Sequence, residues 1–204
     1  MTGTAASRLG YFDGLYGDDP DPYGLRTRWY EERKRAVLMA SLPHARYARV
    51  YEPGCGAGEL TVDLAARCDD VLASDFSDKA LASARRRAIG LPNVRFQQHV
   101  LPRDWPHEEP PFDLIVVSEL GYFLDAESMT ALAACAVQAL SANGVLVACD
   151  WRPDFAERAS STDNVHEAFA ATGLTRSVRH EEADFLLEVW GRDPLSVAQR
   201  EGIR

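Results

Sequence analysis

From Val50 onward, short apolar runs alternate with longer amphipathic segments. This alternation is typical of βαβ units, which build a mostly parallel sheet. Seven runs are predicted to be strands: Arg49–Glu52, Val71–Ser74, Val94–Gln98, Leu114–Ser118, Val145–Asp150, Leu174–His180 and Phe185–Trp190. Apolar residues recur at helical spacing in three of the segments between them, which are Glu59–Arg67, Asp78–Ile89 and Ser128–Leu140. The chain is therefore expected to adopt an α/β fold.

Only a few polar residues separate the last two predicted strands. Because a parallel crossover needs a dozen or more residues, these strands are expected to pair as an antiparallel hairpin, so that the sheet ends on a reversed strand. Asn143-Gly144 is typical of a turn and is expected to lead into the fifth strand. The pattern predicts a Rossmann-like, seven-stranded sheet, mostly parallel with an antiparallel terminal hairpin and with helices on both faces.

The region ahead of this pattern has a different character. Gly, Pro and Asp mix with aromatic residues, and the chain becomes helical from about Trp29 until Pro43. We expect residues 1–43 to form an N-terminal helical lid, with Asp18-Asp19-Pro20 as its hinge, and residues 44–193 to form the Rossmann-like core. A chain of 204 residues with 46% hydrophobic residues can bury one such core, so residues 1–204 are expected to be a single domain.

Composition narrows the classes of partner. No stretch approaches the roughly 20 apolar residues of a membrane helix, and the first ten residues lack the pattern of a signal peptide. We therefore expect a cytoplasmic protein, a monomer or homodimer, without a membrane partner. A net charge of −9 repels phosphate backbones, so no nucleic-acid partner is expected. The four cysteines show neither a CxxC pair nor zinc spacing, which predicts no metal site.

The stretch VYEPGCGAGEL, residues 50–60, follows the first predicted strand and precedes a helix, where open α/β sheets bind ligands. Gly54, Gly56 and Gly58 allow positive φ angles and a close approach of the backbone to a ligand. The dinucleotide fingerprint needs a small residue five positions after its first glycine, but Glu59 stands there. A carboxylate at that position also repels a pyrophosphate, which disfavours an NAD-dependent oxidoreductase. A glycine-rich turn without a ligand is the alternative.

The pattern E-x-G-x-G-x-G resembles motif I of the class I S-adenosylmethionine-dependent methyltransferases. A ligand that carries a sulfonium and no phosphate is attracted to carboxylates. The resemblance implies that Glu52 lies near the methionine amino group of the cofactor, and that Gly54, Cys55, Gly56 and Gly58 pass beneath its amino-acid part. It also implies S-adenosylmethionine as the cofactor and S-adenosylhomocysteine as the product.

Two further stretches bear on the cofactor. VLASDFS ends the second predicted strand on Asp75, whose carboxylate can accept both ribose hydroxyls, with Phe76 beside it. A helix N-cap at Asp75 or Ser77 is the alternative. After the third strand, methyltransferases of this type often carry an acid that binds adenine, but this chain offers His99 and Val100. Adenine is therefore expected to be held there by backbone groups and apolar packing.

The fourth predicted strand, in FDLIVVSELGYFL, exits through Ser118 and Glu119. In the class I family this segment lines the methionine end of the cofactor. The resemblance implies that Ser118 and Glu119 contact the cofactor and that Tyr122 faces the substrate near the transferable methyl group. Simple packing is the alternative for Tyr122. Packing explains Glu119 less well, because an acid directly after an apolar strand rarely points into a core unpaired.

Three stretches together resemble the NodS-like branch of this family: DDPDPYGLRTRWYEERKR, FDLIVVSELGYFL and RHEEADFLLEVW. The resemblance extends from Asp18 to Trp190. It implies methyl transfer to a small molecule, with an amine on a sugar-like acceptor as the first substrate. An O-methyltransferase of a small metabolite and a cofactor-binding module without turnover are the alternatives.

Methyl transfer from a sulfonium is an in-line displacement, in which the enzyme mainly positions two reactants and excludes water. An amine must be neutral when it attacks, so desolvation and a proton acceptor suffice. Glu119, Asp150 and His166 are the predicted catalytic residues. Asp150 ends the fifth strand at the edge of the sheet where the cofactor is expected, and the imidazole of His166 can titrate near neutral pH. His180, in the terminal hairpin, is expected to be structural or solvated.

The predicted helix from Trp29 is expected to close over the cofactor. Tyr30 and Arg33 are the expected cofactor contacts on this helix. Arg33 can pair with the methionine carboxylate through two hydrogen bonds, or with neighbouring charges on an exposed helix face. Trp29 and Trp151 are expected to contact the substrate.

Overall fold

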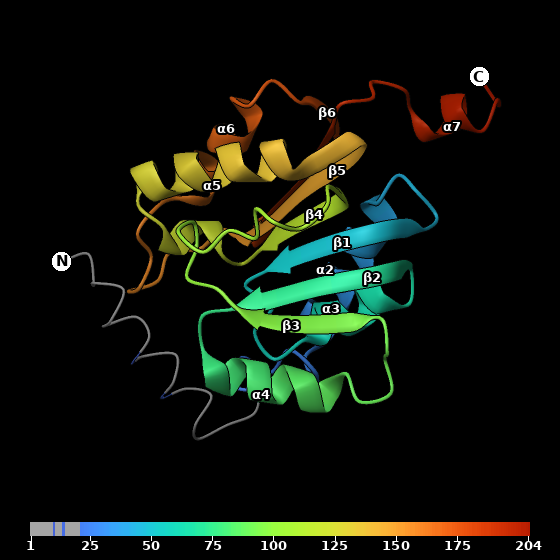
Figure 1. Ribbon diagram of the computed structural model, residues 1–204. Coiled ribbons are helices and arrows are strands. Elements are labelled where there is room, and N and C mark those ends of the chain that lie inside the picture. The colour runs from blue at the N-terminus through green and yellow to red at the C-terminus, as the bar shows by residue number, and fades with distance from the viewer. Residues whose placement is uncertain (1–9, 11–13, 15–20) are drawn as a thin grey trace.

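The computed structural model describes residues 10, 14 and 21–204 of the chain. Its seven strands form one sheet in the order β3-β2-β1-β4-β5-β7-β6 (Figure 1). The strands are β1 Tyr47–Pro53, β2 Cys68–Asp75, β3 Val94–Gln98, β4 Phe112–Ser118, β5 Leu140–Trp151, β6 Thr175–Glu181 and β7 Phe185–Gly191. Each predicted strand is confirmed, and the Asp18-Asp19-Pro20 hinge lies outside the described residues.

The terminal hairpin is confirmed, because β7 pairs antiparallel with both β5 and β6. The sequence suggests that the sheet ends on the reversed strand. In the structure the reversed strand β7 lies inside the sheet, and β6 is the edge strand. The predicted turn at Asn143-Gly144 is wrong, because these residues lie within β5. Phe112 pairs with Leu140 and Leu114 with Val145, so the extra residues form a bulge.

The helices are α2 Trp29–Ser41, α3 Glu59–Ala65, α4 Asp78–Arg87, α5 Ala126–Ala139, α6 Thr162–Ala170 and α7 Val197–Arg200, with a 3₁₀ turn η1 at Gly121–Phe123. Side chains cap four of them at their N-termini. Ser77 accepts from the amide of Ala80 at α4, Asp125 from that of Ser128 at α5, Ser161 from that of Asn164 at α6, and Ser196 from that of Gln199 at α7. Ser77, rather than Asp75, is therefore the cap of α4.

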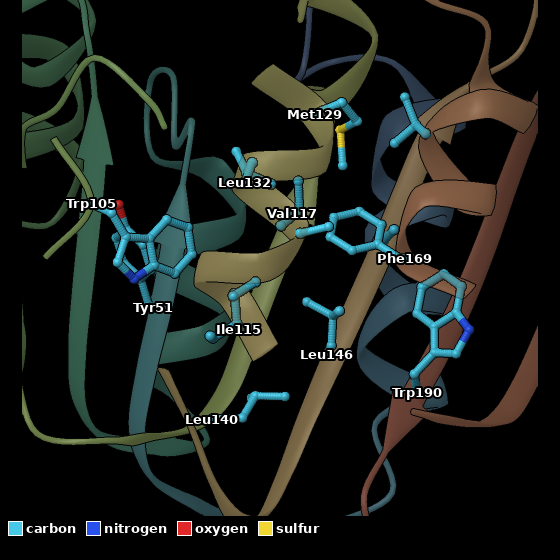
Figure 2. Close-up of a cluster of buried hydrophobic side chains, with 14 of the residues drawn as sticks. Tyr51, Trp105, Ile115, Val117, Met129, Leu132, Leu140, Leu146, Phe169 and Trp190 are labelled. Atoms are coloured by element: carbon cyan, nitrogen blue, oxygen red, sulfur yellow. The ribbon is translucent and has the colours of Figure 1, made fainter. Parts of the chain in front are cut away.

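Helices cover both faces of the sheet, as the alternation of side chains along the strands requires. Ile115 and Val117 of β4 point to the face covered by α5 and α6, where they meet Met129 and Phe169 (Figure 2). Their neighbours Leu114 and Val116 pack on the opposite face, against residues of α2 and α3. Figure 1 shows the resulting three layers, with α5 and α6 on one side of the sheet and α2, α3 and α4 on the other.

Several parallel strands end at the same edge of this sheet. β1, β2 and β4 all run parallel, so the residues that follow Pro53, Asp75 and Ser118 come together there. Helix α2 lies beside this edge and supplies one more wall. Among residues 21–204, none of the helices has the length and apolar character that a membrane crossing requires.

Candidate active site

A cavity of about 550 Å³ opens at the carboxyl ends of the parallel strands and extends to α2. Most of the residues that the sequence singles out line it: Tyr30, Glu52, Gly54, Cys55, Gly56, Asp75, Phe76, His99, Val100, Ser118, Glu119, Tyr122 and Trp151. Five others do not line it: Trp29, Arg33, Gly58, Asp150 and His166. Within the described ranges, no cluster of His, Cys, Asp and Glu side chains suits a metal ion.

The glycine loop forms the floor of the cavity. The amides of Gly54 and Cys55 both donate to the carbonyl of Ser74, at 2.7 and 2.9 Å, which fixes the loop to the end of β2. Gly54 has a φ of 75°, and a Cβ there would lie 3.3 Å from the side chain of Leu120. The positive φ and this close approach both favour glycine.

Gly58, the third glycine of the motif, has a different structural role. Gly58 is the N-cap of α3, with a φ of 83°, and a Cβ there would lie 3.0 Å from the Cβ of Ala84 on α4. Gly58 therefore allows α3 and α4 to pack closely and does not face the cavity. The expected cofactor contact at Gly58 is corrected accordingly.

Glu52 is a buried acid in the cavity wall, with an exposed fraction of 3%. Burial raises the pKa of Glu52 to about 8, opposed by the hydroxyl of Thr61, which donates to its Oε2, and reinforced by the charges of Asp63 and Asp75. A cation placed beside Glu52 would favour its ionised form, so this wall is suited to a positively charged group.

Asp75 lies across the glycine loop from Glu52. Its Oδ2 accepts from the amide of Gly56 at 3.0 Å, and its Oδ1 accepts from the amide of Ser77 at 2.9 Å. These bonds fix the carboxylate in the cavity wall, and a carboxylate can accept several hydrogen bonds at once.

His99 and Val100 form the wall that follows β3. The ring of His99 contacts Tyr51 Oη through Nδ1 and Gln97 Oε1 through Nε2, both at 3.0 Å. Burial lowers the pKa of His99, which favours the neutral ring at neutral pH. The amide of Val100 donates to Asp104 Oδ2 at 2.9 Å, so the nearby acid is turned back onto its own loop.

Glu119 is held by hydrogen bonds from three sides. Its Oε1 accepts from Lys34 Nζ at 2.7 Å, and its Oε2 accepts from the Tyr122 hydroxyl and, at 3.1 Å, from the amide of Trp151. Its backbone φ is 56°, which is rare for a residue other than glycine. Such strained residues persist where their surroundings fix them, often at functional sites.

Sequence reasoning missed Lys34, which is buried in the cavity wall. Its Nζ also lies 3.0 Å from Glu31 and 5.3 Å from the ring centroid of Tyr30. Burial opposes its charge, but the carboxylates of Glu119 and Glu31 hold the pKa of Lys34 above its ordinary value. The only sequence signal was the i,i+3 spacing of Glu31 and Lys34, which is equally typical of an exposed helix face.

Asp150 and His166 lie behind the cavity wall. Successive residues of a strand point to opposite faces, so Cys149 and Trp151 reach the cavity while Asp150 points toward α6. Asp150 is fully buried and forms an ion pair with His166. The predicted direct catalytic contacts of Asp150 and His166 are therefore corrected.

The helical period of α2 likewise divides its three predicted site residues and Lys34 between two faces. Tyr30 and Lys34, four positions apart, face the cavity. Arg33 points away from it and forms two hydrogen bonds, of 2.8 and 2.7 Å, with the carboxylate of Glu182. Trp29 is 70% exposed. The bidentate partner of Arg33 thus belongs to the protein itself, and Trp29 does not reach the substrate side of the cavity.

Comparisons with known proteins agree with this geometry. A family model described as a methyltransferase domain matches residues 50–144. Trans-aconitate 2-methyltransferase of Methylobacterium nodulans is 42% identical over 92 residues, which are 43% of this chain and 34% of that protein. The chain thus spans only about a third of the length of this curated relative.

Solved structures match over a longer range. A candidate methyltransferase from Pseudomonas syringae is 45% identical, with a TM-score of 0.73 over 81% of this chain and 100% of that chain. The N-methyltransferase NodS from Bradyrhizobium japonicum WM9, in complex with S-adenosyl-L-homocysteine, is 24% identical, with a TM-score of 0.80 over 92% of this chain and 98% of that chain. The former is a relative in sequence, and the latter shares the fold.

Proposed function

Because the chain belongs to the class I S-adenosylmethionine-dependent methyltransferases, we propose that it methylates an amine nitrogen of a small molecule, with an amino sugar as the first acceptor. When bound, S-adenosylmethionine supplies a methyl group on a cationic sulfonium. The observation that carries the choice of nitrogen is the pair of acids Glu31 and Glu119, which both lie against the ammonium of Lys34 in the cavity wall, so that these three groups together carry a net negative charge.

The cofactor half of the cavity suits this ligand. The buried carboxylate of Glu52 can pair with the ammonium of the methionine part. Asp75, fixed by two backbone amides, is suited to accept hydrogen bonds from the ribose hydroxyls. Gly54 and Gly56, with φ angles of 75° and 53°, leave the backbone free of side chains between these two acids.

The acceptor half is lined by aromatic rings as well as charges. The cavity that holds the carboxylate of Glu119 is also lined by Tyr30, Tyr122, Phe123, Trp151 and Phe155. Aromatic faces and carboxylates together favour a cation. In N-methylation, positive charge moves from sulfur to the acceptor nitrogen, so a fixed carboxylate beside that nitrogen stabilises the transition state.

We assign this stabilising role to Glu119. Both of its oxygens already accept hydrogen bonds from the protein, which preorganises the carboxylate. The surrounding rings exclude water and favour the neutral, nucleophilic amine. Positioning of two reactants in this way can supply roughly 7–11 kcal/mol of the barrier. The methylated amine forms as an ammonium, and its proton is released to solvent.

A second candidate is methylation of a carboxylate oxygen, which the similarity to trans-aconitate 2-methyltransferase favours. An acceptor carboxylate beside Lys34 would also meet the carboxylates of Glu31 and Glu119, and like charges repel. The likeness of fold to the N-methyltransferase NodS supports nitrogen. An amino sugar is accordingly the first acceptor to test.

The test compares acceptor classes. The protein is incubated with S-adenosylmethionine and, in separate reactions, glucosamine, deacetylated chitooligosaccharides, simple alkylamines and trans-aconitate. Mass spectrometry then detects one added methyl group together with S-adenosylhomocysteine. We expect methylated amine and no methyl ester. A methyl ester without methylated amine would establish the second candidate, and cofactor binding without any product would leave a binding module.

A further inference from the structure

Behind the acceptor side lies a chain of buried charges that the proposed reaction does not use. Asp150, His166 and Glu188 have exposed fractions of 0%, 3% and 1%. His166 Nδ1 lies 2.9 Å from Glu188 Oε2, and His166 Nε2 lies 3.2 Å from Asp150 Oδ2. Glu188 Oε1 accepts from Arg176 and Arg179 on the edge strand β6. The chain thus runs from the sheet edge to the residue before Trp151 in the cavity wall.

The position of His166 between two carboxylates calls for its charged form. An ionised carboxylate only accepts, and only the imidazolium can donate from both ring nitrogens. The 3.2 Å contact with Asp150 is not aligned as a hydrogen bond, and neither oxygen of Asp150 has a hydrogen-bond partner in the described part of the chain. Burial raises the pKa of Asp150, and the contact with His166 opposes this by favouring the ionised carboxylate.

The pKa of His166 follows the same balance. Burial opposes its charge, but Asp150 and Glu188 outweigh burial and hold the pKa of His166 above its ordinary value. Contacts with His166 and the arginines also lower the pKa of Glu188 to about 2, although burial opposes this. Both shifts favour the imidazolium form of His166 and the ionised carboxylate of Glu188.

Helix α6, which carries His166, also supports the acceptor side of the cavity. Thr162 at its start donates to the carbonyl of Trp151 at 2.6 Å. Val165 packs so closely on Gly121 that a Cβ there would lie 2.4 Å from Val165 Cγ1. Two amides just before the helix donate to the carbonyl of Tyr122, at 2.8 and 3.0 Å. The position of α6 therefore sets the positions of two aromatic residues of the cavity.

We propose that His166 is a positioning residue: by bridging Asp150 on β5 and Glu188 on β7, it fixes α6 to the sheet, and α6 holds Trp151 and Tyr122 in place for the acceptor. This inference rests on the proposed methyl transfer. Glu52 and Asp75 lie on β1 and β2, and the glycine loop between them is fixed to β2, away from α6. His166 should therefore influence the acceptor and leave cofactor binding unchanged.

The bridge should depend on pH in one direction. The pKa of His166 is raised in the folded protein. The stability that the bridge contributes is therefore fully present below the ordinary pKa of histidine, and it is lost as the pH rises through the pKa of His166 in the folded state. The neutral ring has one N–H and can hold only one carboxylate. The other titratable or charged groups around the bridge are Arg176 and Arg179 of β6, Arg158 beside Thr162, Tyr122 of η1, Glu119 and Lys34 near Asp150, and Asp163 and Glu167 of α6 itself.

Among these groups, the arginines stay charged, and burial raises the pKa of Tyr122 well above its ordinary value. Lys34 likewise titrates above its ordinary range. The arginines and Lys34 should therefore stay charged, and Tyr122 should stay neutral, as the pH rises above neutral. A change in α6 there is assigned to His166.

Hydrogen exchange with S-adenosylhomocysteine present tests the bridge without an acceptor. Exchange is followed by mass spectrometry at pH 6.5 and at successive values up to 9.5, and is expressed as protection factors corrected for the intrinsic rate. In the wild type, protection of residues 159–170 should fall about tenfold with rising pH, at the value where NMR shows His166 losing its proton. The variant His166→Gln keeps an N–H donor but cannot titrate. Its protection of residues 159–170 should be low and independent of pH.

Kinetics provide the second readout, with glucosamine as the acceptor. For His166→Gln, the KM for glucosamine should rise about tenfold and lose its pH dependence, while the KM for S-adenosylmethionine stays as in the wild type. Thr162→Val removes the bond to Trp151 but keeps His166, so it should raise the KM for glucosamine and keep the pH dependence. His107→Gln, at an exposed histidine, is the matched control and should change neither.

Two results would overturn the proposal. One is wild-type protection of residues 159–170 that does not follow the titration of His166. The other is equal loss of protection in α6 and in the β1–α3 region of His166→Gln, which would reveal general destabilisation. If no amine is methylated by the wild type, the proposed function fails, and the exchange experiment still decides whether the bridge exists.

Discussion

Lys34 on α2 and Glu119 after β4, 85 residues apart in the sequence, form an ion pair of 2.7 Å in the wall of the cavity. The pair joins the N-terminal helix to the end of the sheet. It also sets the charge on the acceptor side, because Glu31 lies 3.0 Å from the same ammonium. Both consequences can be measured.

Replacement of Lys34 by Met should destabilise the protein by about 1–3 kcal/mol, because it leaves Glu31 and Glu119 close together without a cation. Urea denaturation at pH 7 measures this change. Arg46→Met is the matched control, since its ion pair with Asp69 is more than half exposed and should contribute under about 1 kcal/mol. Equal effects of the two substitutions would contradict the role of Lys34.

The charge on the acceptor side should control the choice of acceptor. Glu31→Gln removes one negative charge and should raise the KM for a cationic amine about three- to tenfold. Addition of Lys34→Met to Glu31→Gln should restore the net charge and recover much of that loss. Steady-state kinetics with glucosamine distinguish this from a packing effect, in which the second substitution would make the loss larger.

Replacement of Glu52 by Gln should stabilise the free protein at alkaline pH. In the free protein, burial raises the pKa of Glu52 to about 8, so its contribution to stability is full below about pH 4.5 and lost as pH rises through about 8. Glutamine carries no charge at any pH. Urea denaturation should therefore show the variant to be more stable than the wild type at pH 9 and little different at pH 4.5.

The same substitution should weaken cofactor binding. The ammonium of S-adenosylhomocysteine should ionise Glu52 on binding, so the wild type should release a proton below pH 8 and bind more tightly as the pH rises toward 8. Calorimetry in buffers of different ionisation enthalpy measures that proton. Glu52→Gln should bind at least tenfold more weakly without proton release. Unchanged affinity would remove Glu52 from the cofactor site.

Gly121→Ala should displace α6, because the added Cβ would lie 2.4 Å from Val165 Cγ1. Overpacking of this kind costs about 1–3 kcal/mol. Val165→Ala removes the clashing methyl groups and should restore most of the lost stability in the double variant. Thermal or urea unfolding is measured for the wild type, the two single variants and the double variant. If the effects of the two substitutions on stability simply add, Gly121 and Val165 do not meet.

The strands could be predicted from the sequence because both faces of the sheet are covered, which makes each strand a short apolar run. The positions of Glu52 and Asp75 in the cavity wall followed from their places at the ends of strands β1 and β2. Asn143-Gly144 could not be placed, because its turn propensity is accommodated by a bulge that depends on pairing with β4.

The direction in which each side chain points was harder to predict from the sequence. Asp150 and Trp151 are neighbours on one strand, so only one of them can face the cavity, and the sequence did not indicate which. Lys34 was missed because a charged residue on a helix is usually exposed. Its burial depends on Glu119, which comes from a distant part of the chain.

The most direct test of the account is the rate of methyl transfer by wild-type protein and by Glu119→Gln. S-adenosylmethionine with a deuterated methyl group is supplied together with a deacetylated chitooligosaccharide, and mass spectrometry follows the labelled product. We expect the wild type to methylate the amine, and Glu119→Gln to lose about 100-fold in kcat while binding S-adenosylhomocysteine normally. A wild-type rate in the variant, or label found only on oxygen, would contradict an acceptor amine stabilised by Glu119.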